Sequence, residues 1–216
     1  MSDIFVIMDN LEYTRGNYIS RNRILSMNGI SYLTIPVDYK QSSRKLISEI
    51  NLDTRRYLHS VRKIIETIRH SYSKKPGFKT FFPVFEQLMK KERDTILHLD
   101  MEMIESITNY LNITTQIILA SSLNISGCKE NELFIDLCSK TRCDQVLLGL
   151  GASTKYINKE KITGSGIQIT YQNFVHPVYS QGKRNFYPGI SIVDLLFNVE
   201  KKEAEMLVKN SGSIEK

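Results

Sequence analysis

Long apolar runs are missing from this chain of 216 residues. No run approaches the length of about 20 residues that a membrane-spanning helix needs. The amino terminus also lacks the basic and apolar segments of a signal peptide. We therefore expect a cytoplasmic protein without a transmembrane segment. Internal repeats and low-complexity segments are absent as well, which excludes repeat architectures.

Cysteine is scarce and carries no recognisable pattern. Cys128, Cys138 and Cys143 are odd in number and show no CxxC spacing, so they indicate neither a disulfide framework nor a zinc site. Asp9 is a single carboxylate with Asn10 beside it, which makes a poor metal site. The sequence also has no Walker motif and no GxGxxG motif. We expect no metal and no cofactor.

Basic residues are in excess but are not gathered in one place. The net charge is +6, with Lys and Arg interspersed among Asp and Glu. This distribution and the lack of a nucleic-acid-binding motif argue against nucleic acid as a partner. The same charge suits sugar phosphates or association with an anionic membrane surface.

Apolar runs alternate with amphipathic segments in the first and last parts of the chain. Ile4–Met8 is a continuous apolar run typical of a strand buried on both faces. Strands are predicted over Ile4–Met8, Tyr32–Val37, Ile117–Ala120, Val146–Gly149 and Ile167–Tyr171, and helices over Glu132–Cys143 and Tyr156–Thr163. Because strand and helix alternate, the predicted fold class is α/β, with a largely parallel sheet and flanking helices.

The middle of the chain, about 55–111, is predicted to be a helical insertion. Apolar residues recur there at spacings of three and four, namely Leu58, Val61, Ile65, Ile68 and Tyr72. This period indicates a long amphipathic helix. Pro83 is expected in the first turn of a second helix, and Asp100 is expected to cap a third over Asp100–Leu111. The chain is expected to form one domain over 1–208, with a flexible tail over 209–216.

Polar residues concentrate just after the first strand. Asp9 and Tyr13 follow it, and then Arg21, Asn22 and Arg23. In open α/β sheets, ligands bind beyond the carboxyl ends of the strands. Arginine binds phosphate or carboxylate with a planar fork of donors, so this segment is a candidate anion site. An ion pair of one arginine with Asp9 or Glu12 is the alternative interpretation.

Two later segments are further candidates. Gly149 and Gly151 lie between a predicted strand and helix, where main-chain N–H groups can hold an anion or where a tight turn needs small residues. His176 stands in a loop with Tyr179 and Gln181. A neutral imidazole can accept a proton from an attacking amine, although such a histidine can also serve a local hydrogen bond. The strand ends at Ser121-Ser122, Gly149-Leu150-Gly151 and Tyr171-Gln172 are expected to share one sheet edge, where Asp9 is also expected to lie.

Several motifs resemble those of the WbqC-like protein family, bacterial proteins associated with O-antigen and other surface polysaccharides. The matching motifs are Asp3, Phe5-Val6, Asp9-Asn10, Glu12-Tyr13, Arg15, Arg21-Asn22-Arg23-Ile24, Asn28-Gly29, Thr34-Ile35-Pro36, Ala120-Ser121-Ser122-Leu123, the glycine loop, His176-Pro177-Val178-Tyr179 with Gln181, and Ser191–Asn198. Members usually carry a further upstream strand and helix, and this chain begins after them. The usual acidic pair is Asp9-Asn10 here, and the usual glutamine is Glu12.

The resemblance implies a protein that binds a phosphorylated or nucleotide-activated amino sugar and assists its N-acyl or aminoacyl transfer. Arg21 and Arg23 are expected to hold the anion, Asp9 and Tyr13 the sugar hydroxyls, and His176 to act as the base. The alternative is a non-catalytic binding or scaffold protein of a glycan-assembly pathway. The sequence specifies neither the sugar, nor the acyl donor, nor the oligomeric state.

Overall fold

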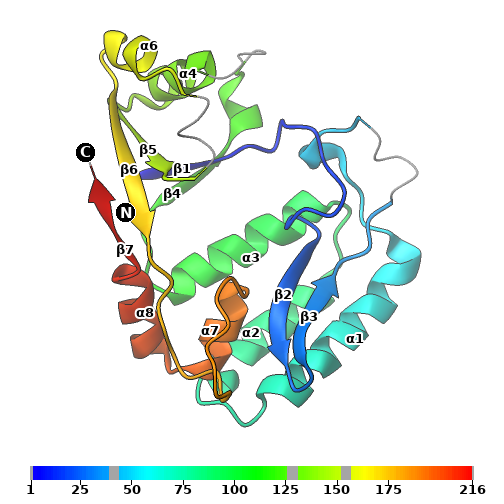
Figure 1. Ribbon diagram of the computed structural model, residues 1–216. Coiled ribbons are helices and arrows are strands. Elements are labelled where there is room, and N and C mark those ends of the chain that lie inside the picture. Colours follow the sequence, from blue (N-terminus) through cyan, green and yellow to red (C-terminus); the bar gives the residue numbers. More distant parts are fainter. Residues whose placement is uncertain (1, 39–43, 126–130, 152–156, 216) are drawn as a thin grey trace. The chain divides into compact units, whose positions relative to one another are not determined.

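The computed structural model describes residues 2–38, 44–125, 131–151 and 157–215. It contains helices and strands with short parallel pairings, which confirms the α/β class (Figure 1). Internal contacts divide the chain into two compact units. The expected single domain over 1–208 stays a prediction. We name Met1–Met8, Thr115–Pro177 and Lys209–Lys216 the sheet unit, and Asp9–Thr114 with Val178–Val208 the helical unit.

The sheet unit consists of short strands with two helices beside them. β1 (Ile4–Ile7) pairs in parallel with β4 (Gln116–Leu119), which the short helix η3 (Ala120–Leu123) follows. β5 (Gln145–Gly149) pairs in parallel with β6 (Gln168–Phe174), and β7 (Gly212–Glu215) pairs antiparallel with β6. α4 (Asn131–Thr141) contacts β5, and α6 (Lys159–Gly164) contacts β6 (Figure 1). The succession β5–α6–β6 confirms the predicted βαβ arrangement.

Two features of the sheet unit differ from expectation. β1 is not buried on both faces, because the Phe5 side chain is 50% exposed. The tail that was expected to be flexible contains β7, whose residues pair with Tyr171 to Phe174 of β6. This pairing supplies partners for main-chain N–H and C=O groups that an unpaired tail would leave to water.

The helical unit packs its helices around one apolar core. The helices are η2 (Ile47–Glu49), α1 (Thr54–Tyr72), α2 (Phe78–Lys90), α3 (Ile96–Tyr110), α7 (Ile192–Asn198) and α8 (Lys201–Lys209). Phe197 of α7 is fully buried, and its ring contacts the rings of Tyr72, Phe78, Phe81, Phe82 and Phe85. Such aromatic pairs add about 0.5–1.5 kcal/mol each beyond the area that they bury.

The helix boundaries correct three details of the sequence reading. α2 begins at Phe78, so Pro83 lies inside the helix and not in its first turn. α3 begins at Ile96, and its cap is Thr95, whose side chain accepts a hydrogen bond from the His98 N–H at 3.3 Å. Asp100 therefore lies in the second turn of α3. In α1, Leu58 is 53% exposed, and Ile64 is buried instead.

A hairpin of two antiparallel strands lies against α1. β2 (Arg21–Ser26) and β3 (Gly29–Thr34) pair over their whole length, from Arg21 opposite Thr34 to Ser26 opposite Gly29. The predicted turn at Asn28-Gly29 is confirmed, and Gly29 has a φ of 108° that L side chains rarely adopt. β3 begins at Gly29, earlier than the predicted strand over Tyr32–Val37, because the turn pairs Gly29 with Ser26 of β2.

Candidate functional site

A cavity of about 140 Å³ lies within the helical unit, between the hairpin, α1, α2, α3 and the start of α7. Most of its wall is apolar. Its polar lining residues are Tyr18, Ser20, Arg21, Asn22, Asp100 and Ser191, and its apolar ones are Ile19, Ile24, Leu33, Ile35, Ile64, Phe85, Met89, Leu99, Met103 and Val193. An apolar hollow with a few polar groups is the usual form of a small-molecule site. We call it the hairpin pocket.

Asp100 is the carboxyl group of the hairpin pocket. Among the residues that the structure describes, its side chain has no hydrogen-bond or ion-pair partner. Burial raises the pKa of this carboxyl from 3.8 to about 7, because an apolar surrounding disfavours the charged form. A carboxyl in a pocket with such a shifted pKa is a candidate functional group.

Arg21 lies at the start of β2 and lines the same pocket. Its guanidinium carbon is 4.8 Å from the centre of the Tyr32 ring, a cation–π contact that holds the side chain against the hairpin. The ion pairs among the described residues include neither Arg21 nor Arg23, so the alternative ion pair with Asp9 or Glu12 does not form. The charge of Arg21 is therefore not neutralised by a carboxylate of these residues.

Arg23 joins the hairpin to the segment before α7. Its Nη2 donates to the Gly189 oxygen at 2.6 Å, and its main-chain oxygen accepts from the Ser191 N–H at 2.9 Å. Its Nε is buried and has no hydrogen-bond partner among the described residues. Asn22, between the two arginines, is exposed, and its side-chain oxygen accepts from the Arg23 N–H at 2.8 Å. The role of Arg23 and Asn22 in anion binding stays a prediction.

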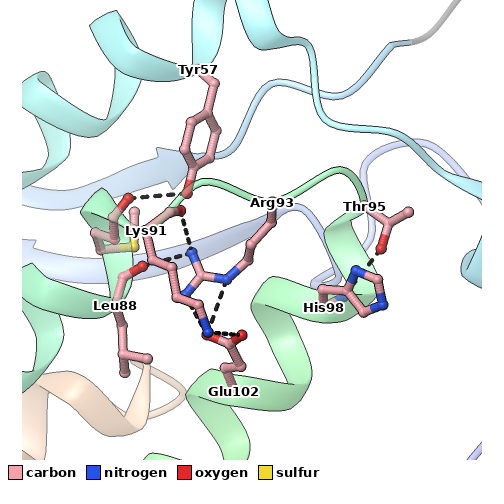
Figure 2. Close-up of polar contacts among 8 residues, drawn as sticks. Tyr57, Leu88, Lys91, Arg93, Thr95, His98 and Glu102 are labelled. Carbon is pink, nitrogen blue, oxygen red and sulfur yellow. Dashed lines mark hydrogen bonds and ion pairs between the residues drawn. The ribbon is translucent and has the colours of Figure 1, made fainter.

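An ion-pair network links the end of α2 to α3 (Figure 2). Arg93 is only 2% exposed at its side chain, and its Nη1 donates to the Leu88 and Lys91 oxygens, each at 2.7 Å. Its Nε and Nη2 donate to Glu102 Oε2 at 3.1 and 2.6 Å. Hydrogen bonds from Lys91 and Arg93 lower the pKa of the Glu102 carboxyl. The network fixes the turn of α3 that follows Asp100.

Asp9 and Tyr13 are buried in the helical unit. Asp9 is 1% exposed, has partners within the chain, and accepts from the Ser48 N–H at 3.0 Å through its main-chain oxygen. The Tyr13 hydroxyl lies 2.7 Å from Ser20 Oγ, and Ser20 lines the hairpin pocket. Tyr13 thus supports the wall of the pocket. Neither predicted contact with a sugar hydroxyl is tested by these positions.

Tyr179 and Gln181 belong to a second polar cluster, centred on the fully buried carboxylate of Asp194. The Tyr72 hydroxyl donates to Asp194 Oδ1, and the Tyr179 hydroxyl donates to Oδ2 at 2.8 Å. Gln181 Nε2 also donates to Oδ2, at 3.2 Å. Burial raises the pKa of both tyrosines, and the charge of Asp194 raises it further. The hydroxyls therefore remain protonated donors.

This cluster holds the segment between Val178 and Ser191 against α1. The Tyr72 hydroxyl accepts from the Leu25 N–H at 3.1 Å, which links the cluster to β2. Gln181 binds Tyr187 through both ends of its amide, at 2.8 and 3.1 Å. The positions of Tyr179 and Gln181 favour a structural contribution to the helical unit, and their contact with substrate stays a prediction.

The remaining candidates lie in the sheet unit. Gly149 ends β5 opposite Gln172 of β6, and Gly151 follows it. A Cβ added at either glycine would meet no atom within 4 Å, so close packing does not require glycine there. His176 is exposed, and its ring makes an edge contact with Phe174 at 4.8 Å. Residues 152–156 of the predicted loop and helix lie outside the described residues.

The sequence did not predict a site role for two residues, Asp100 of the hairpin pocket and Asp194 of the second cluster. Asp100 was interpreted as a cap, because it precedes a run with helical period. Asp194 sits inside the apolar run from Val193 to Phe197. A charged residue within an apolar run is the signal that could have drawn attention to it, since charges are buried only with partners.

No metal or membrane feature emerges from the described part of the chain. There, no group of three or more His, Cys, Asp or Glu side chains could hold a metal ion. Likewise, none of the helices in these ranges is both long and apolar enough to cross a membrane. Independence of metals stays a prediction.

The geometry defines an α/β protein with a cavity beside a hairpin, and the comparisons supply its family. The sequence profile of the WbqC-like protein family matches residues 1–206, so the chain belongs to this family. The chain is also similar to the uncharacterized protein Rv1507c of Mycobacterium tuberculosis, with 26% identity over 207 residues, which cover 95% of this chain and 87% of that protein. No solved structure matches.

Proposed function

We propose that the protein binds a phosphorylated or nucleotide-activated amino sugar in the hairpin pocket and assists its N-acyl or aminoacyl transfer in glycan or O-antigen biosynthesis. The observation that carries the proposal is that Arg21 and Asp100 line one cavity, while among the described residues Arg21 has no ion pair and Asp100 has no hydrogen bond or ion pair. Membership in the WbqC-like protein family supports the same class of substrate.

The size of the pocket suits one sugar ring. An apolar cavity of about 150 Å³ holds one benzene molecule, and the hairpin pocket measures about 140 Å³. A sugar ring is also six-membered and has apolar C–H faces that can pack against walls such as Leu99 and Met103. A phosphate or diphosphate attached to the ring would extend beyond this volume.

Arg21 is the group that we propose for that phosphate. A guanidinium presents parallel N–H donors to two phosphate oxygens, which makes such pairs strong and directional. Its stacking on Tyr32 leaves the donor edges of the guanidinium available while reducing the entropy lost on binding. Arg23 is proposed to contribute positive charge from the next position on the same face of β2 as Arg21.

The roles of the other predicted residues belong to the same proposal. Asp9 and Tyr13 are proposed to hold sugar hydroxyls, Gly149 and Gly151 to contact an anion, and His176 to act as the base. The acyl-transfer assay below tests the role of His176, and the pocket geometry tests none of these assignments.

Titration calorimetry with a panel of nucleotide sugars, free nucleotides, coenzyme A esters and amino acids tests the binding step. We expect one nucleotide sugar to bind selectively, and Arg21→Ala to weaken that binding about ten- to a hundredfold, as loss of a charged hydrogen bond does. Arg62→Ala is the matched control, because Arg62 is an exposed arginine of α1 outside the pocket. Equal effects of the two variants would refute the assignment of Arg21.

An acyl-transfer assay with the ligand so identified then tests turnover. We expect His176→Ala to lower the rate while it leaves binding in the hairpin pocket unchanged. Selective binding without any acyl transfer would instead identify a non-catalytic binding protein of a glycan-assembly pathway. A folded protein that binds no member of the panel would contradict the proposed function.

A further inference from the structure

Asp100 contributes the carboxyl group to the lining of the hairpin pocket. It projects from the second turn of α3 between Leu99 and Met103, which are also wall residues. The structure shows no donor to it among the described residues. Asp100 is half-buried, and a polar group without a partner in an apolar surrounding costs free energy, so its position calls for an explanation.

The charged groups around Asp100 do not supply that partner. Among the residues that line the pocket with it, the titratable ones are Tyr18, before β2, and Arg21 on β2, while α1, α2 and α7 contribute no titratable group to the lining. Neither Tyr18 nor Arg21 forms a hydrogen bond or ion pair with Asp100. Glu102, in the same turn, is already engaged by Lys91 and Arg93.

We propose that Asp100 is the recognition group for a protonated primary amine carried by a ring that fills the hairpin pocket. An ammonium group has donors and a positive charge, and both would compensate the carboxylate in this apolar surrounding. A hydroxyl could donate one hydrogen bond but would leave the negative charge without a counter-charge. The inference rests on the proposed function for its substrate, an amino sugar, and names the residue that distinguishes the amine from a hydroxyl or an amide.

Binding of an amine by Asp100 has a consequence that a structural role lacks. Burial holds the pKa of the empty pocket's Asp100 at about 7, so the carboxyl is mostly protonated at pH 6. An ammonium ion beside it favours the carboxylate, and the proton must leave to solvent. Binding of a cationic amine near pH 6 should therefore release close to one proton, whereas binding of a neutral analogue should release none.

The test uses ring-sized probes that do not depend on the identity of the sugar. Cyclohexylamine and cyclohexanol have the same ring and differ only in the polar substituent. Titration calorimetry at pH 6 in two buffers of different ionisation enthalpy measures binding and proton release together. We expect cyclohexylamine to bind at least tenfold more tightly than cyclohexanol, with proton release, and Asp100→Asn to abolish both the preference and the release.

Glu105→Gln is the matched control, because Glu105 is an exposed carboxyl of α3 outside the pocket lining. It should leave the preference and the proton release unchanged. Equal binding of the two probes, absence of binding, or an unchanged preference in Asp100→Asn would overturn the inference. The proposed function would still stand in these cases if a nucleotide sugar bound in an Arg21-dependent manner. If the protein bound no member of the nucleotide panel but bound cyclohexylamine as expected, the proposed function would be refuted and the role of Asp100 would stand.

Discussion

Replacement of Asp100 by asparagine should make the protein more stable at neutral pH. The pKa of Asp100 is raised from 3.8 to about 7 in the folded chain. This difference of about three pKa units corresponds to about 4 kcal/mol between the two protonation states. Asparagine has the same shape and carries no charge, so it removes the cost of ionising a buried carboxyl.

The sign of the pH dependence follows from the order in which the unfolded and the folded chain lose the Asp100 proton. The unfolded chain ionises Asp100 near pH 4, whereas the folded chain keeps the proton until about pH 7. Between these values the folded state binds more protons, so the contribution of Asp100 to the free energy of unfolding falls as the pH rises. Above about pH 7 this contribution stays at its low value.

Urea unfolding of both proteins at pH 4 and pH 8 measures the effect. We expect the two free energies of unfolding to agree within about 1 kcal/mol at pH 4, because the carboxyl is then protonated in the folded chain. At pH 8 Asp100→Asn should be more stable by up to about 4 kcal/mol, or of the order of 10 °C in the melting temperature.

The difference between wild type and Asp100→Asn cancels the contribution of the other carboxyls to the pH dependence of unfolding. Glu102 and Glu86 have lowered pKa values and therefore give a pH dependence of the opposite sign. The control Glu105→Gln should leave the pH dependence unchanged. A difference between wild type and Asp100→Asn that is the same at pH 4 and pH 8 would refute the reasoning.

Three further predictions concern the packing that supports the pocket. Gly77→Ala should destabilise the protein by about 3 kcal/mol in urea, because its Cβ would lie 2.2 Å from the main-chain oxygens of Leu196 and Val199. Gly164→Ala, with open space around it, should have little effect. Glu102→Gln should lower the free energy of unfolding by about 2 kcal/mol at pH 7 and by less at pH 3. The pKa of Glu102 is lowered by its hydrogen bonds, so its ion pair with Arg93 is lost as the pH falls. An equal loss at both pH values would contradict this. Tyr179→Phe should cost about 1.5–3 kcal/mol, since it removes a 2.8 Å donor to a buried carboxylate, and unchanged unfolding would exclude that bond as a stabilising contact.

The two clusters of the helical unit divide the predicted site into different roles. Arg21 and Asp100 face a cavity and have no carboxylate or donor partner among the described residues. Tyr179 and Gln181 already form hydrogen bonds with Asp194, and Gln181 also with Tyr187. Groups of the first kind can bind a ligand without first breaking an internal bond. Groups of the second kind would lose a stabilising contact in order to do so.

Local sequence patterns predicted several elements of the fold and the family, but not β7, which lies in the tail that was expected to be flexible. Spacings of three and four specified α1, and alternation of strand and helix specified β5, α6 and β6, because side-chain periodicity reflects which face of an element is buried. The motifs around Arg21 and before Asn198 also identified the WbqC-like family.

Only the tertiary structure decided which polar residues share a site. In the sequence, Asp100 is one acidic residue in a helical run and Arg21 is the start of a strand; packing of α3 near the hairpin places both on one cavity. In the same way, a carboxylate within an apolar run became the centre of a hydrogen-bond cluster. Burial and partners arise from contacts between residues far apart in the chain, so no local pattern reveals whether a charge is compensated.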